Sequence, residues 1–253
     1  MIKEVKVRCS DTDILILLTA FYPTFTSHQP DVKVVIDFGT GPHRTLVNIN
    51  QVADQITIPK CRGLLLLHSL SGCDYLSSFF GIVKMKWMDW YLSLTDQNTI
   101  EIFNMLSRGA PEVSHEAQQI LVTVLRHLYK CTTEQGTLED ARFDILIHQN
   151  IDSLRPLPPS SSAFTQHVMR AAYVAGHVWG TADVPSPTLP AFTEWGWTQD
   201  SEGIYPVWTT RLVLTLDIFK TVTKSCKCQN IIIIIIIITS LVAWEIAPAR
   251  WRR

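Results

Sequence analysis

The first part of the chain alternates apolar runs with short polar turns. Residues 4–9 carry Val5 and Val7 and end at Ser10-Asp11-Thr12-Asp13, and residues 14–18 form an apolar run that is compatible with a buried helix or strand. The pattern predicts a strand that ends in an acidic turn. Two carboxylates would then lie at the end of this strand.

A hairpin is predicted next. The apolar, β-branched runs 33–38 and 44–49 flank Gly39-Thr40-Gly41-Pro42, which is typical of a glycine-rich loop between two strands. A helix is expected to begin at about Asn50. Further along, the leucine-rich run 64–70 ends at a second acidic turn, Ser71-Gly72-Cys73-Asp74-Tyr75.

The clearest helix signal begins at Ser114. This serine is the expected N-cap of a helix with an apolar stripe, and Glu116 is favourably placed in the first turn. Strand-like and helix-like segments alternate, which favours an α/β domain over residues 1–154.

The composition changes beyond this domain. Residues 155–162 are rich in proline and serine, a helical stretch runs from Ala163 to about Gly180, and residues 181–207 combine prolines with tryptophans. We therefore expect a linker, a short helix and an irregular Pro/Trp-rich arm over residues 155–230. Residues 231–253 form a low-complexity tail.

The tail contains eight consecutive isoleucines, Ile231 to Ile238, in an apolar stretch that reaches Trp244. A membrane-spanning helix usually needs about 20 apolar residues, so the stretch is short for a span. We expect a low-complexity homopolymer, with a C-terminal membrane anchor as the alternative.

The charge and the cysteine content limit the partners and the cellular compartments that fit the chain. The chain has 22 Lys+Arg and 23 Asp+Glu, a formal net charge of -1, so nucleic-acid binding would depend on a local patch or on metal ions. The six cysteines are scattered, which fits reduced thiols, and the N-terminus lacks the pattern of a secretory signal. We expect an intracellular protein of the nucleus or cytoplasm.

Three acids are candidates for metal chemistry. Asp11 and Asp13 are two residues apart, and on an extended strand their side chains would face the same side, while Asp74 would approach from another element end. Mg²⁺ and Mn²⁺ prefer oxygen ligands and neutralise charge during phosphodiester hydrolysis. By itself, an Asp-x-Asp turn is more typical of a solvated loop than of a metal site.

A second motif adds a family resemblance. The segment His68 to Tyr75, followed by Phe79 to Lys86, resembles the Leu-Gly-Ser/Cys-Asp-Tyr to Gly-Ile-Gly-x-Lys segment of flap endonucleases and their relatives in the PIN-like 5′ nuclease superfamily. In that superfamily an Asp-x-Asp at a strand end precedes this segment, as Asp11-Thr12-Asp13 does here.

The chain is more closely similar to a group of transposon-associated invertebrate proteins. Their motifs appear here as Leu157-Pro158-Pro159-Ser160, Gln166 to Ala171, Trp179, Gly196-Trp197 and Cys226-Lys227-Cys228. The last motif resembles the start of a Tesmin/TSO1-type CXC block. The resemblance covers about residues 4–228.

The resemblance implies a PIN-like fold, in which helices flank a central, mostly parallel sheet, and a metal-dependent endonuclease or 5′ nuclease activity. Asp11, Asp13 and Asp74 would be the catalytic carboxylates and would hold Mg²⁺ or Mn²⁺. Gly81, Lys84 and Lys86 would bind nucleic acid, DNA rather than RNA.

Three departures from the family keep a second function open. The family carries further acids upstream of Asp-x-Asp, so we expect an N-terminally truncated domain with an incomplete carboxylate set. Val83 takes the place of the second hairpin glycine, where a β-branched residue resists positive φ. Cys226 and Cys228 supply two of the four ligands that zinc needs. The alternative is a catalytically inactive interaction module or a decayed transposon-derived fragment.

The remaining candidates have simpler interpretations. His68 is expected to be a core histidine that is hydrogen-bonded to backbone, and Lys60, Lys84 and Lys86 are also compatible with a solvated face. The tryptophans of the arm, Trp195, Trp197 and Trp208, are expected to pin it to the domain rather than to stack on bases. The oligomeric state stays open.

Overall fold

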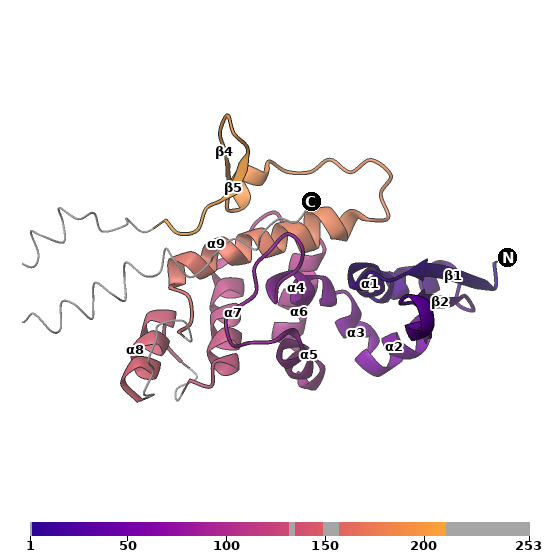
Figure 1. Ribbon diagram of the computed structural model, residues 1–253, viewed down its shortest axis with the longest axis horizontal. Coiled ribbons are helices and arrows are strands. Elements are labelled where there is room, and N and C mark those ends of the chain that lie inside the picture. The colour runs from indigo at the N-terminus through magenta and orange to yellow at the C-terminus, as the bar shows by residue number, and fades with distance from the viewer. Residues whose placement is uncertain (1, 132–134, 149–156, 211–253) are drawn as a thin grey trace, which may run out of the picture. The chain divides into compact units, whose positions relative to one another are not determined.

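The computed structural model describes residues 2–131, 135–148 and 157–210 (Figure 1). The chain divides into two compact units of interleaved segments. Unit 1 comprises Met1–Tyr75, Lys84–Val113 and Ala171–Pro190, and unit 2 comprises Leu76–Val83, Ser114–Arg170 and Ala191–Arg253. The predicted boundaries at residues 154 and 230 lie outside the described residues and stay predictions.

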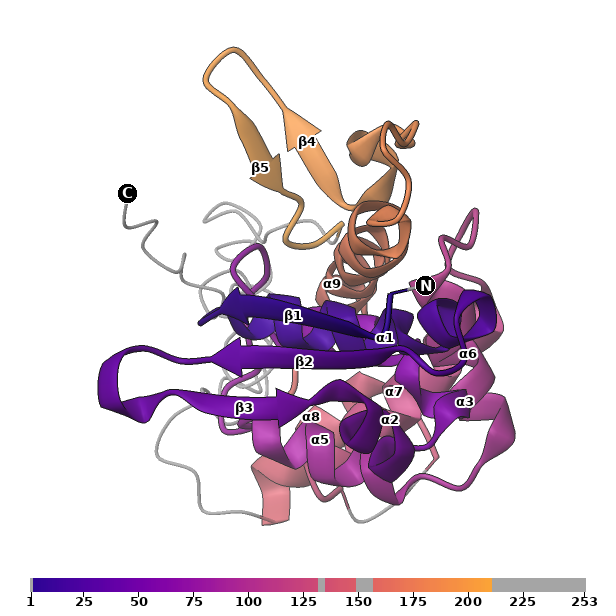
Figure 2. The ribbon, with the colours of Figure 1, turned by 90° about the vertical axis from the view of Figure 1, so that its right-hand side faces the viewer.

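Unit 1 contains a three-stranded sheet with the order β1-β2-β3. Strand β1 (Glu4–Cys9) pairs in parallel with β2 (Lys33–Phe38), and β2 pairs antiparallel with β3 (Thr45–Asn48) after the short 3₁₀ helix Gly41–His43. Helix α1 (Thr12–His28) links β1 to β2 and lies behind the sheet in Figure 2. The predicted first strand and hairpin are confirmed. The fold is mixed α/β, and the described sheet has one parallel and one antiparallel pairing.

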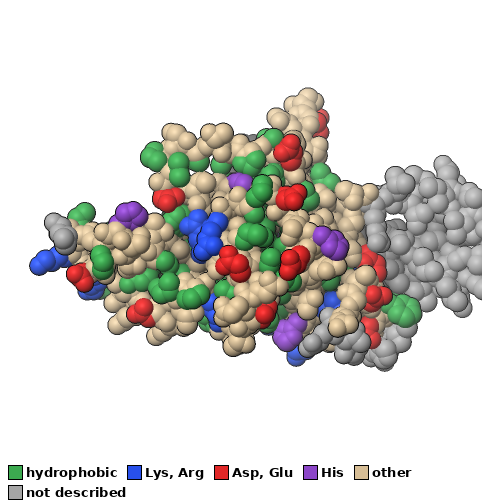
Figure 3. Space-filling model, turned by 180° about the vertical axis from the view of Figure 1, so that it is seen from behind, with side chains coloured by type: hydrophobic (Ala, Val, Ile, Leu, Met, Phe, Trp, Pro, Cys, Tyr) green, Lys and Arg blue, Asp and Glu red, His purple; other side chains and the backbone are tan. Residues whose placement is uncertain are grey.

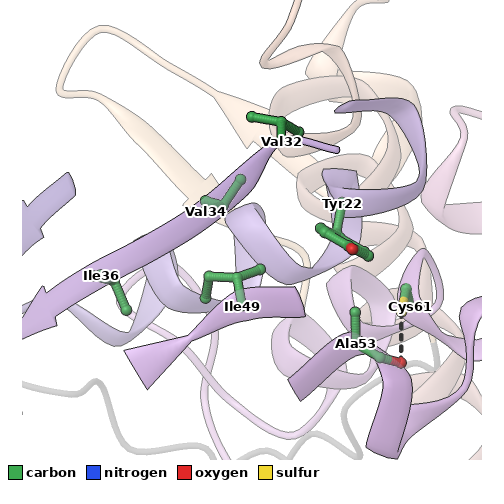
Figure 4. Packing of buried hydrophobic residues seen from close by; sticks show 7 residues of the cluster. All are labelled: Tyr22, Val32, Val34, Ile36, Ile49, Ala53 and Cys61. Carbon is green, nitrogen blue, oxygen red and sulfur yellow. Dashed lines mark hydrogen bonds between the residues drawn. The ribbon is translucent and has the colours of Figure 1, made fainter. Parts of the chain in front are cut away.

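The core of unit 1 lies between this sheet and its helices. Strand β2 contributes four consecutive buried residues because the strand is central and β-branched. Helices α2 (Ile49–Ile56) and α3 (Ile58–Cys61) follow the hairpin, in agreement with the expected helix near Asn50. Figure 4 shows how the buried side chains meet; they are Tyr22, Val32, Val34, Ile36, Ile49, Ala53 and Cys61.

Helix α4 (Leu64–Leu70) is the centre of the rest of unit 1, since all of its residues are buried. It packs against α5 (Lys84–Ser93), α6 (Gln97–Ser107) and the π-helical turn Tyr173–Val178, which the 3₁₀ turn Trp179–Thr181 continues. Arg62 joins these segments: it donates to the carbonyls of Ser107 at 3.2 Å and Gly180 at 2.6 Å. Arg62 of the first segment is therefore hydrogen-bonded to both the second and the last segment of unit 1.

Unit 2 is built on three helices, α7 (His115–Leu128), α8 (Leu138–His148) and α9 (Ser161–Ala172). The Ser114 hydroxyl accepts from the Ala117 N–H at 3.2 Å, which confirms the predicted cap of α7. Thr165 of α9 donates to Gln118 of α7 at 3.3 Å, so these two helices contact each other.

The Pro/Trp-rich arm contains the 3₁₀ turn Phe192–Trp195 and a small hairpin of β4 (Trp197–Gln199) and β5 (Ile204–Pro206). Arg170 of α9 donates to the carbonyls of Gly196 at 3.0 Å and Val207 at 2.6 Å. Its guanidinium lies 5.7 Å from the ring centroids of both Trp197 and Trp208. Within unit 2, Arg170 thus joins the arm to α9, and the pinning of the arm to residues 1–154 stays a prediction.

Two features of the sequence lie outside the described residues: the Cys226–Cys228 pair and the Ile231–Trp244 run. Among the helices that the structure does describe, none combines the length and the apolar character needed to cross a membrane. The four described cysteines, at positions 9, 61, 73 and 131, are thiols that form no disulfide with one another.

Candidate functional site

The two acids of the first turn lie at the start of α1. Asp11 adopts an extended backbone, and its carboxylate caps the helix by accepting from the Asp13 N–H at 2.9 Å. Asp13 belongs to the first helical turn, where a negative charge is favourable at the positive end of the helix dipole. The expectation that both side chains share one face of an extended strand is therefore wrong, because the helix begins between them.

His68 connects Asp13 to a lysine of another helix. Its side chain on α4 is 5% exposed, and its Nε2 lies 2.7 Å from Asp13 Oδ1. Its Nδ1 lies 3.0 Å from Lys84 Nζ, at the first residue of α5. The expectation of a core histidine is confirmed, but its ring nitrogens bind two side chains instead of backbone groups.

The proton positions follow from the donors available. A lysine ammonium only donates, so His68 Nδ1 accepts from Lys84, and the Nε2–H is then assigned as the donor to the Asp13 carboxylate. This makes the imidazole neutral. Burial lowers the pKa of His68, and this outweighs the hydrogen bond to Asp13, which raises the pKa. Burial likewise lowers the pKa of Lys84.

Aromatic rings cover the histidine. The Trp179 ring centroid lies 5.4 Å from that of His68 with an interplanar angle of 42°, and Tyr75 meets Trp179 edge-on at 6.4 Å. Trp179 is 8% exposed. Hydrogen bonds strengthen where water is excluded, so these rings favour a well-ordered Asp13–His68–Lys84 array.

Asp74 lies in an exposed turn that follows α4. Its charge raises the pKa of Lys84, as does the charge of Asp13, while the charge of Asp11 raises the pKa of His68. Unit 1 thus brings all three predicted acids within electrostatic range of one His–Lys pair. Asp11 and Asp74 are exposed, so a solvent-borne ligand can reach both.

The predicted nucleic-acid contacts divide between the two units. Lys84 and the half-buried Lys86 belong to α5 of unit 1, whereas the exposed Gly81 belongs to unit 2. Gly81 has a φ of +75°, a value that suits glycine, and Val83 is 66% exposed. Of the three predicted contacts, the structure places Lys84 beside the acids.

The grouping of the three acids can be compared with the ligand sets that bind metal ions in proteins. In the part of the chain that is described, no three His, Cys, Asp or Glu side chains are grouped to hold a metal ion. Mg²⁺ is usually bound by one or two carboxylates and completes its shell with water and substrate phosphates. The donor set fits an ion bound in this way and does not form an all-protein cage.

Figure 3 shows one face of the molecule, on which basic side chains are interspersed with acidic ones. On this face no broad basic area stands out among the described residues, which agrees with the near-neutral net charge. Lys84 is the cation that the site supplies.

Sequence reasoning missed the role of His68 in the array and the role of Trp179, which packs on the His68 ring. The role of His68 depends on partners that lie 55 and 16 residues away along the chain, and no local pattern reveals them. Trp179 appeared in the sequence only as part of the family resemblance. Comparison with protein-family models, with curated proteins and with solved structures finds no significant match for the chain.

Proposed function

We propose that this chain is a PIN-like, nuclease-related protein that hydrolyses phosphodiester bonds of nucleic acid with Mg²⁺ or Mn²⁺. The observation that supports the proposal best is the hydrogen-bonded Asp13–His68–Lys84 array, on which the charges of Asp11 and Asp74 also act. Acids and a cation that share one partly buried place are the groups that phosphoryl chemistry needs.

Each side chain has a distinct task in this proposal. Asp11, Asp13 and Asp74 would hold the metal ion, one or two of them directly and the rest through bound water, and the ion would neutralise charge at the phosphate and lower the pKa of bound water. Lys84 would donate to a phosphate oxygen, since its ammonium has further N–H groups beyond the one that His68 accepts. Asp74 and Asp11 would meet the polymer first because both are exposed.

The substrate class is nucleic acid, DNA rather than RNA. The family resemblance carries this preference. A near-neutral chain lacks the broad basic field that gives salt-driven binding to any nucleic acid, so affinity would depend on the metal ion and on local lysines.

Calorimetric titration of the full chain with Mn²⁺ tests the metal site. We expect binding by the wild type, with the heat lost in Asp13→Asn and in Asp74→Asn. Asp31→Asn is the matched control, because Asp31 is an exposed acid of unit 1 that has no part in the array. An unchanged titration in both site variants would contradict the assignment.

A cleavage assay tests the reaction. Flap and single-stranded DNA are incubated with each variant in Mg²⁺ or Mn²⁺, and the circular dichroism spectrum confirms that each variant is folded. We expect cleavage by the wild type and by Asp31→Asn only. Cleavage that survives both Asp13→Asn and Asp74→Asn would show that the activity does not come from this site.

A second candidate is a catalytically inactive interaction module. It is favoured by the engagement of Asp13, which already accepts from His68 at 2.7 Å, and by the exposed Val83 at the hairpin position. This candidate predicts DNA binding that is the same with and without Mn²⁺, and no cleavage. Mn²⁺-dependent binding would argue against it.

A further inference from the structure

We propose that His68 is the positioning residue of this site. Its neutral imidazole holds the Asp13 carboxylate and the Lys84 ammonium in a fixed relation, so that the metal-binding and phosphate-binding groups act together. This inference rests on the proposed function and adds to it a residue that touches neither metal nor substrate.

The first support is the geometry. Asp13 lies on α1, His68 on α4 and Lys84 on α5, and the two hydrogen bonds of 2.7 and 3.0 Å join the three helices through one ring. A planar ring with nitrogens on two sides fixes both partners at once. Neither partner can shift without losing its bond to the imidazole.

The second support is the rigidity of the histidine itself. Helix α4 is buried along its whole length, and the Ser71 hydroxyl donates to the His68 carbonyl at 3.2 Å. Trp179 packs on the ring from the last segment of unit 1. The packing that holds His68 in place is therefore the same packing that forms the core of unit 1.

The third support is the charge. If Asp13 and Lys84 met directly, each would neutralise the other, and both would be less able to bind a ligand. A neutral ring between them accepts a hydrogen bond from Lys84, donates one to Asp13 and keeps the two opposite charges apart. Asp13 can then act on a cation and Lys84 on an anion at the same time.

Two conservative substitutions separate the two arms of the ring. The amide nitrogen of glutamine reaches about as far as Nε2, so His68→Gln keeps a donor to Asp13 and loses the acceptor for Lys84. The amide of asparagine reaches only as far as Nδ1, so His68→Asn keeps an acceptor for Lys84 and loses the donor to Asp13. His68→Ala loses both.

The full chain is titrated with Mn²⁺ by calorimetry and, without metal, with a fluorescent single-stranded oligonucleotide. We expect His68→Gln to keep its Mn²⁺ affinity within about twofold and His68→Asn to lose about tenfold or more, as when the group that orients a metal ligand is removed. We expect the reverse order for the oligonucleotide, with a loss of about fivefold in His68→Gln. His167→Gln is the control, since His167 is an equally buried histidine of unit 2.

The outcomes separate the two proposals. A wild-type chain that binds no Mn²⁺ overturns the proposed function together with this inference. Mn²⁺ binding by the wild type and, with equal affinity, by all three His68 variants overturns the positioning role alone. Nitrogen NMR of the wild-type imidazole gives a readout that needs no variant: we expect the neutral ring with its proton on Nε2, and a proton on Nδ1 would overturn the inference.

Discussion

Each unit holds a cationic side chain away from water, and the two are satisfied in different ways. Arg170 of unit 2 is 1% exposed, donates to two main-chain carbonyls and lies near two indole rings; burial lowers its pKa to about 10. Lys84 of unit 1 is half-buried and donates to an imidazole, with the charges of Asp13 and Asp74 acting on it. Main-chain partners tie Arg170 to the architecture, whereas side-chain partners leave Lys84 able to exchange them for a ligand.

The largest effect is expected at Arg170. Arg170→Met removes the arginine donor from the carbonyls of Gly196 and Val207, of which Gly196 still accepts from the Val207 N–H, and we expect the free energy of unfolding to fall by about 3 kcal/mol. Urea denaturation measures the change. The control Arg108→Met removes an exposed pair with Glu101 and should change stability by less than about 1 kcal/mol. A similarly small change in Arg170→Met would remove the contrast with Lys84.

The stability of unit 1 should depend on close backbone packing rather than on the site. A Cβ at Gly176 would lie 2.3 Å from the Leu106 carbonyl oxygen and 2.7 Å from the Gly109 nitrogen. We expect Gly176→Ala to destabilise the protein by about 2 kcal/mol, in the range of an overpacked core. Urea denaturation tests this against Val178→Ala, a change at a 38% exposed position. Equal stability of the two variants would contradict the prediction.

The next largest loss of stability is expected when the N-cap of α7 is removed. Ser114→Ala removes the acceptor of the Ala117 N–H, and the expected loss is about 1 kcal/mol. Ser114→Asp supplies another acceptor and should restore most of it. If thermal unfolding shows the alanine and aspartate variants to be equally stable, the cap does not contribute to unit 2.

A smaller effect on stability is expected only at acidic pH. The Arg44 guanidinium holds the pKa of Asp37 below its ordinary value of 3.8, with Lys6 and Arg8 adding to the shift. Because the folded pKa is lowered, this stabilisation is present above the unfolded pKa and is lost as pH falls through the folded pKa. Urea midpoints measured from neutral pH to below pH 3.8 should fall less steeply for Asp37→Asn than for the wild type. Identical slopes would contradict the pairing.

The smallest effect on stability is expected at Lys84. Lys84→Met removes a charge whose burial is unfavourable, so we expect the free energy of unfolding to change by less than about 0.5 kcal/mol. Urea denaturation measures this, with the oligonucleotide titration as the companion assay, where binding should weaken. A loss as large as that of Arg170→Met would make Lys84 a structural cation too.

Local signals in the sequence predicted several elements correctly. Three signals depend only on neighbouring residues: the β-branched run 33–38, the glycine-rich loop after it and the Ser114 cap. The strand, the hairpin and α7 could therefore be predicted from the sequence. The helix after Asp11 was left open because an apolar run suits a strand as well. An aspartate directly before such a run is a capping signal, and it would have favoured the helix.

The site could be predicted from the sequence only in part, because some of its residues meet through tertiary packing. Asp11, Asp13, Asp74 and Lys84 were candidates because their residue types and spacing matched a chemistry. The meeting of Asp13, His68 and Lys84 depends on how α1, α4 and α5 pack, and single-sequence patterns carry no information on such distant pairs. Trp179 joins them from a segment that follows Ser114–Arg170 of unit 2 in the sequence.

The order of segments in unit 1 has a consequence for the nascent chain. Arg62 finds its acceptor at Gly180, 118 residues later, and Trp179 covers His68 from the same late segment. At synthesis rates of 5–20 residues per second, the ribosome needs about 6–24 s to supply that stretch. During this interval the His68 ring has been synthesised, whereas the indole that covers it in the folded unit has not.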